Sequence, residues 1–220
     1  LLGILEQGLR EAITSSPGIL FVCAAGNDDN DVAFDVNIPA SFSLPNLLVV
    51  GAVDQAAGRI DVLDGDLRPV VAAGAFAAPG LAPLVAHGIA QIDGQIWVAY
   101  AAPLADGSGG VEPDAGRVVI FDADGVKVEE LAGSDALAAP WAMVRAPESG
   151  FGALNGCALV ASAGKGTIEA WCKDGGRFAY RGPLLAEDGQ PVVIEGLRGI
   201  AFGGAGCDGV ASLYATARNR

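Results

Sequence analysis

Short apolar runs separated by Gly and Asp turns recur through the second half of the chain, and this recurrence constrains the fold most. Two of the runs end in Phe121-Asp122 and Trp171-Cys172, which lie about 50 residues apart in equivalent places. A period of that length with four short strands in each unit is typical of β-propeller blades. We therefore expect residues 80–220 to form an all-β partial β-propeller of about 2.5 blades, fewer than the four to eight of a closed ring.

Three sets of turn residues within these units predict β-hairpins. The hairpins connect residues 89–92 with 95–100, 117–122 with 126–128, and 167–172 with 177–180. Asp-Gly and Gly-Gly pairs at such places supply the positive φ angles that tight hairpin turns need. A Gly- or Pro-led pair of strands is also expected before each hairpin, at His87-Gly88-Ile89-Ala90, Pro140-Trp141-Ala142-Met143 and Leu197-Arg198-Gly199-Ile200-Ala201.

The beginning of the chain follows a different pattern. Apolar residues recur at helical spacing from Leu2 to Ile13, and the Ser-Ser-Pro-Gly run at 15–18 is expected to end that helix. Continuous apolar runs at 19–25 and 47–53 are typical of strands buried on both faces of a parallel sheet. A helix, a buried strand, a polar loop and a second buried strand together predict an α/β fragment.

The two patterns predict a chain of mixed fold class. We expect residues 1–61 to be the α/β fragment of a parallel sheet and residues 62–79, which are rich in Gly, Ala and Pro, to be a junction. The partial β-propeller would then occupy residues 80–220.

The net charge and the composition of the chain limit which classes of partner it can bind. The chain has 26 acidic and 13 basic residues and a formal net charge of −13. Nucleic acid and anionic membranes both require a basic surface, so we expect neither as a partner. No run of apolar residues is long enough to predict a membrane-spanning helix. The chain begins Leu1-Leu2-Gly3 without Met or a basic leader, so we expect a fragment without a signal peptide.

Cysteine and histidine usage limits the chemistry further. The four cysteines, Cys23, Cys157, Cys172 and Cys207, form no CxxC pair, so a zinc site is not expected. Whether one disulfide joins two of them stays open. His87 is the only histidine, and it is expected to be a structural or surface residue rather than a general base.

Two segments near the beginning of the chain carry a resemblance. They are Gly18-Ile19-Leu20-Phe21-Val22-Cys23-Ala24-Ala25-Gly26-Asn27-Asp28 and, after Ile38-Pro39-Ala40-Ser41, Leu44-Pro45-Asn46-Leu47-Leu48-Val49-Val50-Gly51-Ala52-Val53-Asp54. Together they resemble the subtilisin-like serine proteases (peptidase S8) over residues 1–60. The resemblance implies a secreted hydrolase with a protein or peptide substrate, and it implies that Asn27 is the oxyanion-hole donor. The alternative is that Asn27 only tolerates a left-handed turn after Gly26.

The other catalytic residues of that family are missing. The Asp and His of the triad would lie upstream of Leu1, and the window around residues 90–100, where the Ser nucleophile is expected, contains no Ser. Ser108 lies in a polar loop and is not expected to be a nucleophile. We therefore find no nucleophile and no base, expect no cofactor, and predict that this chain alone hydrolyses no peptide bonds.

The second half of the chain carries another resemblance. The matching pieces include Ile92-Asp93-Gly94-Gln95-Ile96-Trp97-Val98-Ala99-Tyr100-Ala101, Gly116-Arg117-Val118-Val119-Ile120-Phe121-Asp122, Gly164-Lys165-Gly166-Thr167-Ile168 and Pro191-Val192-Val193-Ile194-Glu195-Gly196-Leu197. In this order they resemble a bacterial family of NHL-like six-bladed β-propellers over residues 80–217. The resemblance implies a fold and an extracellular or exported setting, and it implies no reaction.

Two further features have alternative interpretations. Asp106, Glu112 and Asp114 lie in an acidic loop, which would suit Ca²⁺ as the one conceivable metal or would simply be solvated turn acids. Trp97, Trp141 and Trp171 fall at what look like equivalent blade positions, where core packing is favoured over a carbohydrate platform.

Three functional hypotheses follow. The first is a fragment of a subtilisin-like serine endopeptidase joined to a β-propeller accessory module. The second is a non-enzymatic β-propeller binding module with a vestigial protease remnant. The third is a gene-model fusion artefact that joins two unrelated segments.

Overall fold

A computed structural model describes residues 2–15, 21–24, 47–50, 60, 75–105, 110–131, 136–203 and 212–218. The chain divides into two compact units. The first unit is Leu1–Ala75 and the second unit is Phe76–Arg220. Among the described residues no helix is long and apolar enough to cross a membrane.

The first unit contains one helix and two short strands. Helix α1 spans Leu2–Thr14, and the strands are β1 (Phe21–Ala24) and β2 (Leu47–Val50). The helix ends at Thr14, directly before the Ser-Ser-Pro-Gly run that was expected to end it. β1 and β2 pair in parallel, with Phe21 opposite Leu47 and Ala24 opposite Val50. The helix and both strands are therefore confirmed as local elements.

The predicted mixed fold class, with an N-terminal α/β fragment of a subtilisin-like parallel sheet, is wrong. Of the twelve described strands, ten lie in antiparallel sheets, and parallel pairing is confined to the four-residue strands β1 and β2. A parallel sheet of an α/β domain needs several strands with crossover helices on both faces, and among the described residues of this unit α1 is the only helix. The described structure is nearly all-β.

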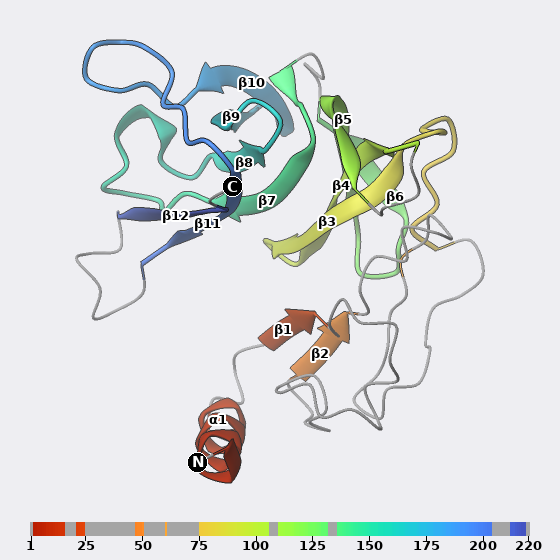
Figure 1. Ribbon diagram of the computed structural model, residues 1–220, viewed down its shortest axis with the longest axis vertical. Coiled ribbons are helices and arrows are strands. Elements are labelled where there is room, and N and C mark those ends of the chain that lie inside the picture. Colours follow the sequence, from red (N-terminus) through yellow and green to blue (C-terminus); the bar gives the residue numbers. More distant parts are fainter. Residues whose placement is uncertain are drawn as a thin grey trace. The chain divides into compact units, whose positions relative to one another are not determined.

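The second unit consists of three antiparallel sheets that follow one another along the chain (Figure 1). Each described sheet is a meander, in which strands adjacent in sequence pair with each other. The first sheet contains β3 (Val85–Ile92), β4 (Gln95–Pro103), β5 (Val111–Phe121) and β6 (Lys127–Glu130). The second contains β7 (Pro140–Arg145), β8 (Ala158–Ser162), β9 (Thr167–Asp174) and β10 (Arg177–Pro183), with the 3-10 turn η2 (Gly152–Leu154) before β8. The third contains β11 (Leu197–Phe202) and β12 (Leu213–Ala217).

All three predicted hairpins are confirmed. β3 and β4 are joined by Asp93 and Gly94, whose φ angles are 54° and 76°. β9 and β10 are joined by Gly175 and Gly176, with φ angles of 56° and 89°. Two consecutive positive φ angles are the signature of the type I′ turn, whose twist matches that of the flanking strands. β5 and β6 form the third hairpin, in which the Asp122 carboxylate accepts the backbone N–H groups of Asp124 and Val126.

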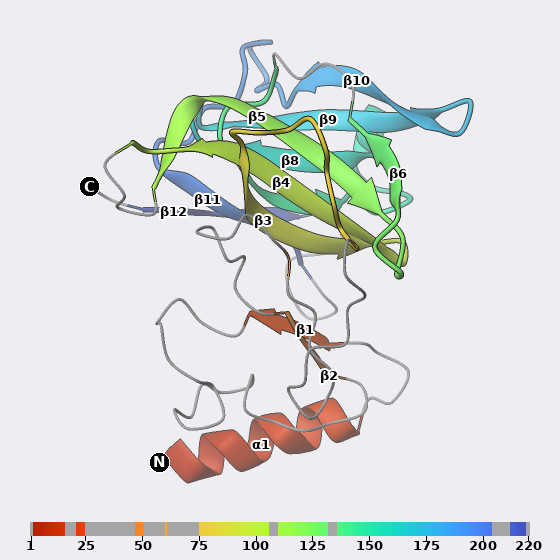
Figure 2. The same ribbon diagram turned by 90° about the vertical axis from the view of Figure 1, so that its right-hand side faces the viewer.

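Two apolar cores join the three sheets. The first and second sheets stack face to face (Figure 2), and the fully buried Trp97 and Trp171 belong to the core between them. Phe178 packs edge-on against Trp97, with ring centroids 4.9 Å apart. Leu159, Ile168, Leu197 and Ile200 form the core between the second and third sheets.

A disulfide joins Cys157 and Cys172 in the second sheet. Ala158 pairs with Trp171 between β8 and β9, so the next residues outward, Cys157 and Cys172, face each other across the two strands. Their Cα atoms are 4.3 Å apart, close to the spacing of a non-hydrogen-bonded antiparallel pair. The question that the sequence left open is thus answered by register.

Candidate functional site

The first strand of each sheet in the second unit carries a β-bulge near its beginning. The register of β3 shifts between Ala86 and Gly88, that of β7 between Pro140 and Met143, and that of β11 between Leu197 and Gly199. The bulge of β3 contains His87, that of β7 contains Trp141 and Ala142, and that of β11 contains Arg198. A bulge adds one residue to a strand and redirects its side chain, and such features are frequent beside functional sites.

The three bulge residues lie together. The rings of His87 and Trp141 meet edge to face, with centroids 4.1 Å apart and planes at 77°. The Arg198 guanidinium lies over the Trp141 ring, 4.5 Å from its centroid. Trp141 contacts both His87 and Arg198 and is therefore the middle of the cluster. Its strand β7 is in contact with both β3 and β11 (Figure 1). We call His87, Trp141 and Arg198 the bulge site.

Gly88 allows this approach of β3 to β7. A Cβ atom at Gly88 would lie 2.1 Å from the carbonyl oxygen of Trp141, which is far inside van der Waals contact. The two backbones can therefore meet only because residue 88 has no side chain. This contact sets the distance between the bulges of β3 and β7, and hence the distance between His87 and Trp141.

The bulge site is half open. His87 is 7% exposed, whereas Trp141 is 36% exposed and Arg198 is half-buried. Burial and, to a lesser extent, the positive charge of Arg198 together lower the pKa of His87 from 6.5 to about 4. The imidazole is therefore neutral at neutral pH, and the guanidinium is the only charge of the three.

This arrangement is suited to recognition. Arg offers planar N–H donors and Trp a broad apolar face, the two residue types enriched at binding hot spots. None of the three is a nucleophile of the serine-protease kind. In the parts of the chain that the structure describes, no three His, Cys, Asp or Glu residues are grouped so as to hold a metal ion.

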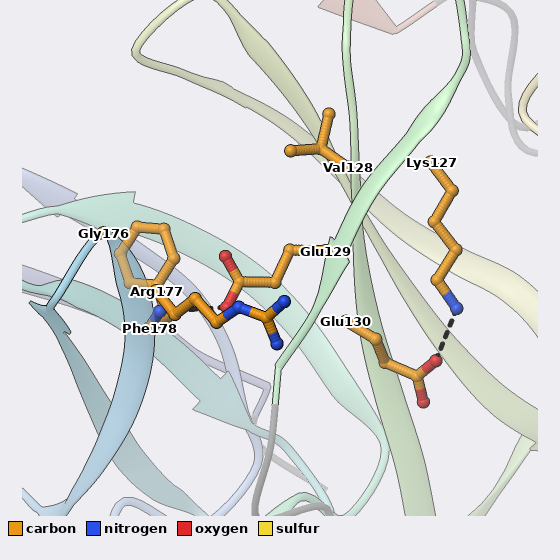
Figure 3. A pocket seen from close by; sticks show the side chains of 7 residues that line it. All are labelled: Lys127, Val128, Glu129, Glu130, Gly176, Arg177 and Phe178. Atoms are coloured by element: carbon orange, nitrogen blue, oxygen red, sulfur yellow. Dashed lines mark hydrogen bonds and ion pairs between the residues drawn. The ribbon is translucent and has the colours of Figure 1, made fainter.

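A groove of about 480 Å³ lies between β6 and β10, the fourth strands of the first and second sheets (Figure 3). Two of its carboxylates already have partners. Lys127 donates to Glu130 at 2.7 Å, and Glu129 accepts the backbone N–H of Phe178 at 2.9 Å. The second bond joins the two sheets, so the groove is explained by the packing of their edges.

A buried carboxylate in the second sheet was not foreseen from the sequence. Glu169 is 3% exposed and accepts hydrogen bonds of 2.6 Å from the hydroxyls of Thr167 and Tyr180. Burial, followed by the bond to Glu169, raises the pKa of Tyr180. The alternation of β9 would place residue 169 on the same face as Trp171, and this is the signal that could have revealed it.

The residues singled out in the sequence are distributed differently from expectation. Asn27, Asp106 and Ser108 lie outside the described residues, while Glu112 and Asp114 lie on β5. The three tryptophans are not equivalent, because Trp97 lies on a second strand, Trp141 on a first and Trp171 on a third. The prediction of core packing is confirmed for Trp97 and Trp171 and is wrong for Trp141. His87 is buried against Trp141, and Arg198 was missed.

Comparison with known proteins identifies partial relatives. No family model matches the chain, and no solved structure matches it. Two uncharacterized proteins of Acanthamoeba polyphaga mimivirus are each 41% identical to it, one over 91 residues and the other over 87. These matches cover 41% and 39% of this chain, but only 23% and 20% of the viral proteins. The chain thus spans less than a quarter of the length of these curated relatives.

Proposed function

We propose that the second unit is a non-enzymatic binding module and that it binds its ligand at the bulge site. One observation carries this proposal: three successive sheets each direct one bulged residue to the same place. The residues brought together are an arginine, a tryptophan and a neutral histidine, which can hold a ligand by stacking and hydrogen bonding. A purely structural contact would not require Trp141 to remain 36% exposed.

Tryptophan fluorescence of the full chain tests this proposal. Trp97 and Trp171 are fully buried, so a ligand at the bulge site should change the emission of Trp141 alone. A panel of sugars, aromatic amides, aromatic carboxylates and amines is titrated. We expect at least one class to bind, and we expect Trp141→Ala to abolish that response.

Tyr214→Ala is the matched control, because Tyr214 is another exposed aromatic side chain of the same unit, on β12. This variant should bind as the unsubstituted chain does. A panel without any binder, or a binder that Trp141→Ala leaves unaffected, would contradict the proposal.

The Cys157–Cys172 disulfide supports the proposal that the protein is exported. Disulfides persist in oxidising compartments and are rare where thiols are kept reduced. Cys157 is only 2% exposed and Cys172 is half-buried, which suits a structural role. Quantification of free thiols in protein isolated from its natural source tests this: the bond should be fully formed, and a reduced pair would contradict export.

The relationship to a subtilisin-like endopeptidase is retained as a second candidate for the first unit. The two resembling sequence segments carry this candidate, because the four-residue pair of β1 and β2 does not make the expected parallel sheet. We propose that the chain by itself is inactive, because the sequence offers neither nucleophile nor base. Casein should stay intact, and a serine-directed fluorophosphonate should label nothing. Casein hydrolysis that the fluorophosphonate inhibits would refute this.

A further inference from the structure

We infer that the bulge site takes a carboxylate, held by Arg198, on a ligand whose aromatic part lies against Trp141. This inference rests on the proposed function and names the ligand class of the same site. The carboxylate would form a bidentate pair with the guanidinium, and the aromatic group would cover the exposed part of the indole.

Most other basic residues of the described structure pair with a carboxylate, whereas Arg198 contacts an aromatic ring. Five of them form ion pairs with carboxylates, namely Arg117, Lys127, Arg145, Lys173 and Arg181. Arg198 has the ring of Trp141 beneath it instead, and within the described parts of the chain no carboxylate lies at ion-pair distance from it.

The contact of the Arg198 guanidinium with the Trp141 ring uses none of its N–H donors. A guanidinium that lies over an aromatic ring points its N–H groups outward in its own plane. Those donors match the spacing of the two oxygens of a carboxylate. Contact with Trp141 also restricts the side chain before binding, which reduces the entropy that a ligand must overcome.

His87 shows that the local potential is positive. Among the described residues, the guanidinium of Arg198 is the charged group that shifts the pKa of His87, and it shifts the pKa downward. A nearby carboxylate would have acted in the opposite direction. The bulge site is therefore a positive spot on an acidic protein, and an anionic group is the complementary ligand.

A titration of the full chain with benzoate tests the inference. Benzamide, which has the same ring without the charge, and phenyl phosphate serve as matched ligands. His87 is the only histidine, so its imidazole C–H resonance reports directly on the site. We expect benzoate to bind at least about ten-fold more tightly than benzamide, as the loss of charge-assisted hydrogen bonds implies. Bound benzoate should also raise the pKa of His87, because its charge offsets that of Arg198.

Substitutions of Arg198 provide the second arm. Arg198→Gln should remove the preference for benzoate over benzamide, and Arg198→Lys should retain part of it. Arg177→Gln, which removes a cation of β10 in the same unit, should leave the preference unchanged. The unfolding midpoint of each variant, followed by tryptophan fluorescence, confirms that it is folded.

The outcomes separate the two proposals. Equal binding of benzoate and benzamide, with loss in Trp141→Ala, would overturn the carboxylate inference and leave the binding function intact. Tighter binding of phenyl phosphate than of benzoate, or benzoate binding unaffected by Arg198→Gln, would also overturn it. A panel in which no compound responds to Trp141→Ala would overturn the binding function itself.

Discussion

Gly88 is the residue on which the geometry of the bulge site depends most directly. Its Cα lies so close to the Trp141 carbonyl that any side chain would force β3 and β7 apart. Gly88→Ala should therefore destabilise the second unit by about 1–3 kcal/mol, the usual cost of overpacking. Urea unfolding followed by tryptophan fluorescence measures this, because all three tryptophans lie within Phe76–Arg220.

Gly8→Ala is the control for the substitution itself. A Cβ at Gly8 would have nothing within 4 Å, and the residue lies in α1 of the first unit. It should leave the tryptophan-detected transition where it is. If Gly88→Ala also left the transition unchanged, the close approach of β3 and β7 would not exist in solution.

The protonation of His87 gives a second prediction at the residue scale. Its imidazole should titrate with a midpoint of about 4 rather than 6.5, and Arg198→Leu should raise that midpoint without restoring 6.5, because burial is the larger cause. The unfolded chain takes up the proton below pH 6.5, whereas the folded chain resists it until about pH 4. The stability contributed by neutral His87 is therefore present above pH 6.5 and is lost as the pH falls toward 4. NMR of the imidazole protons checks this, and a midpoint near 6.5 would show that the ring is solvated.

At the scale of elements, the hairpins were predictable and the bulges were not. The pairs Asp93-Gly94 and Gly175-Gly176 predict their turns, because few other residue pairs accept two positive φ angles. The repeat also placed His87, Trp141 and Arg198 in corresponding strands. A bulge inserts one residue into a pattern of period two, so strand alternation misassigns the direction of that side chain. The small residue that follows each bulged side chain, such as Gly88 or Gly199, is the sequence signal that could have predicted the bulge.

The disulfide between β8 and β9 gives a prediction at this scale. Replacing Cys157 and Cys172 by Ser should reduce the free energy of unfolding by about 3 kcal/mol, because the bond closes a loop with a sequence separation of 15. Cys23→Ser, which lies in the other unit, is the control and should leave the tryptophan-detected transition unchanged. Urea titrations of the two variants measure both effects. A loss well below 1 kcal/mol would mean that the segments of β8 and β9 stay close together in the unfolded chain even without the disulfide.

At the scale of the whole molecule, the division into two units has a direct consequence. The second unit has its own apolar cores, so residues 76–220 expressed alone should fold. The urea midpoint of this fragment should match that of the full chain, as followed by fluorescence of the same three tryptophans. A fragment that fails to unfold cooperatively would show that the first unit contributes to its stability.

The error in fold class also arises at this scale. The apolar runs of the first unit correctly predicted β1 and β2, because a continuous apolar run is typical of a buried strand. Such a run does not specify how many strands flank it or which elements cover it. The described strands that determine the class lie in the antiparallel meanders of the second unit. The individual strands were therefore more predictable than the fold class, which depends on how many strands pair in parallel and how many pair antiparallel.

The bond between Cys157 and Cys172 also changes what a protease would leave behind. The exposed Lys165, in the turn between β8 and β9, offers trypsin a cleavage site inside the segment that the disulfide encloses. Cutting there separates the polypeptide into two pieces that remain covalently linked. The nicked protein would migrate as one species on a gel without reductant and as two once the bond is reduced. Cleavage at this turn would thus go unnoticed in any preparation judged only by its migration on a gel without reductant.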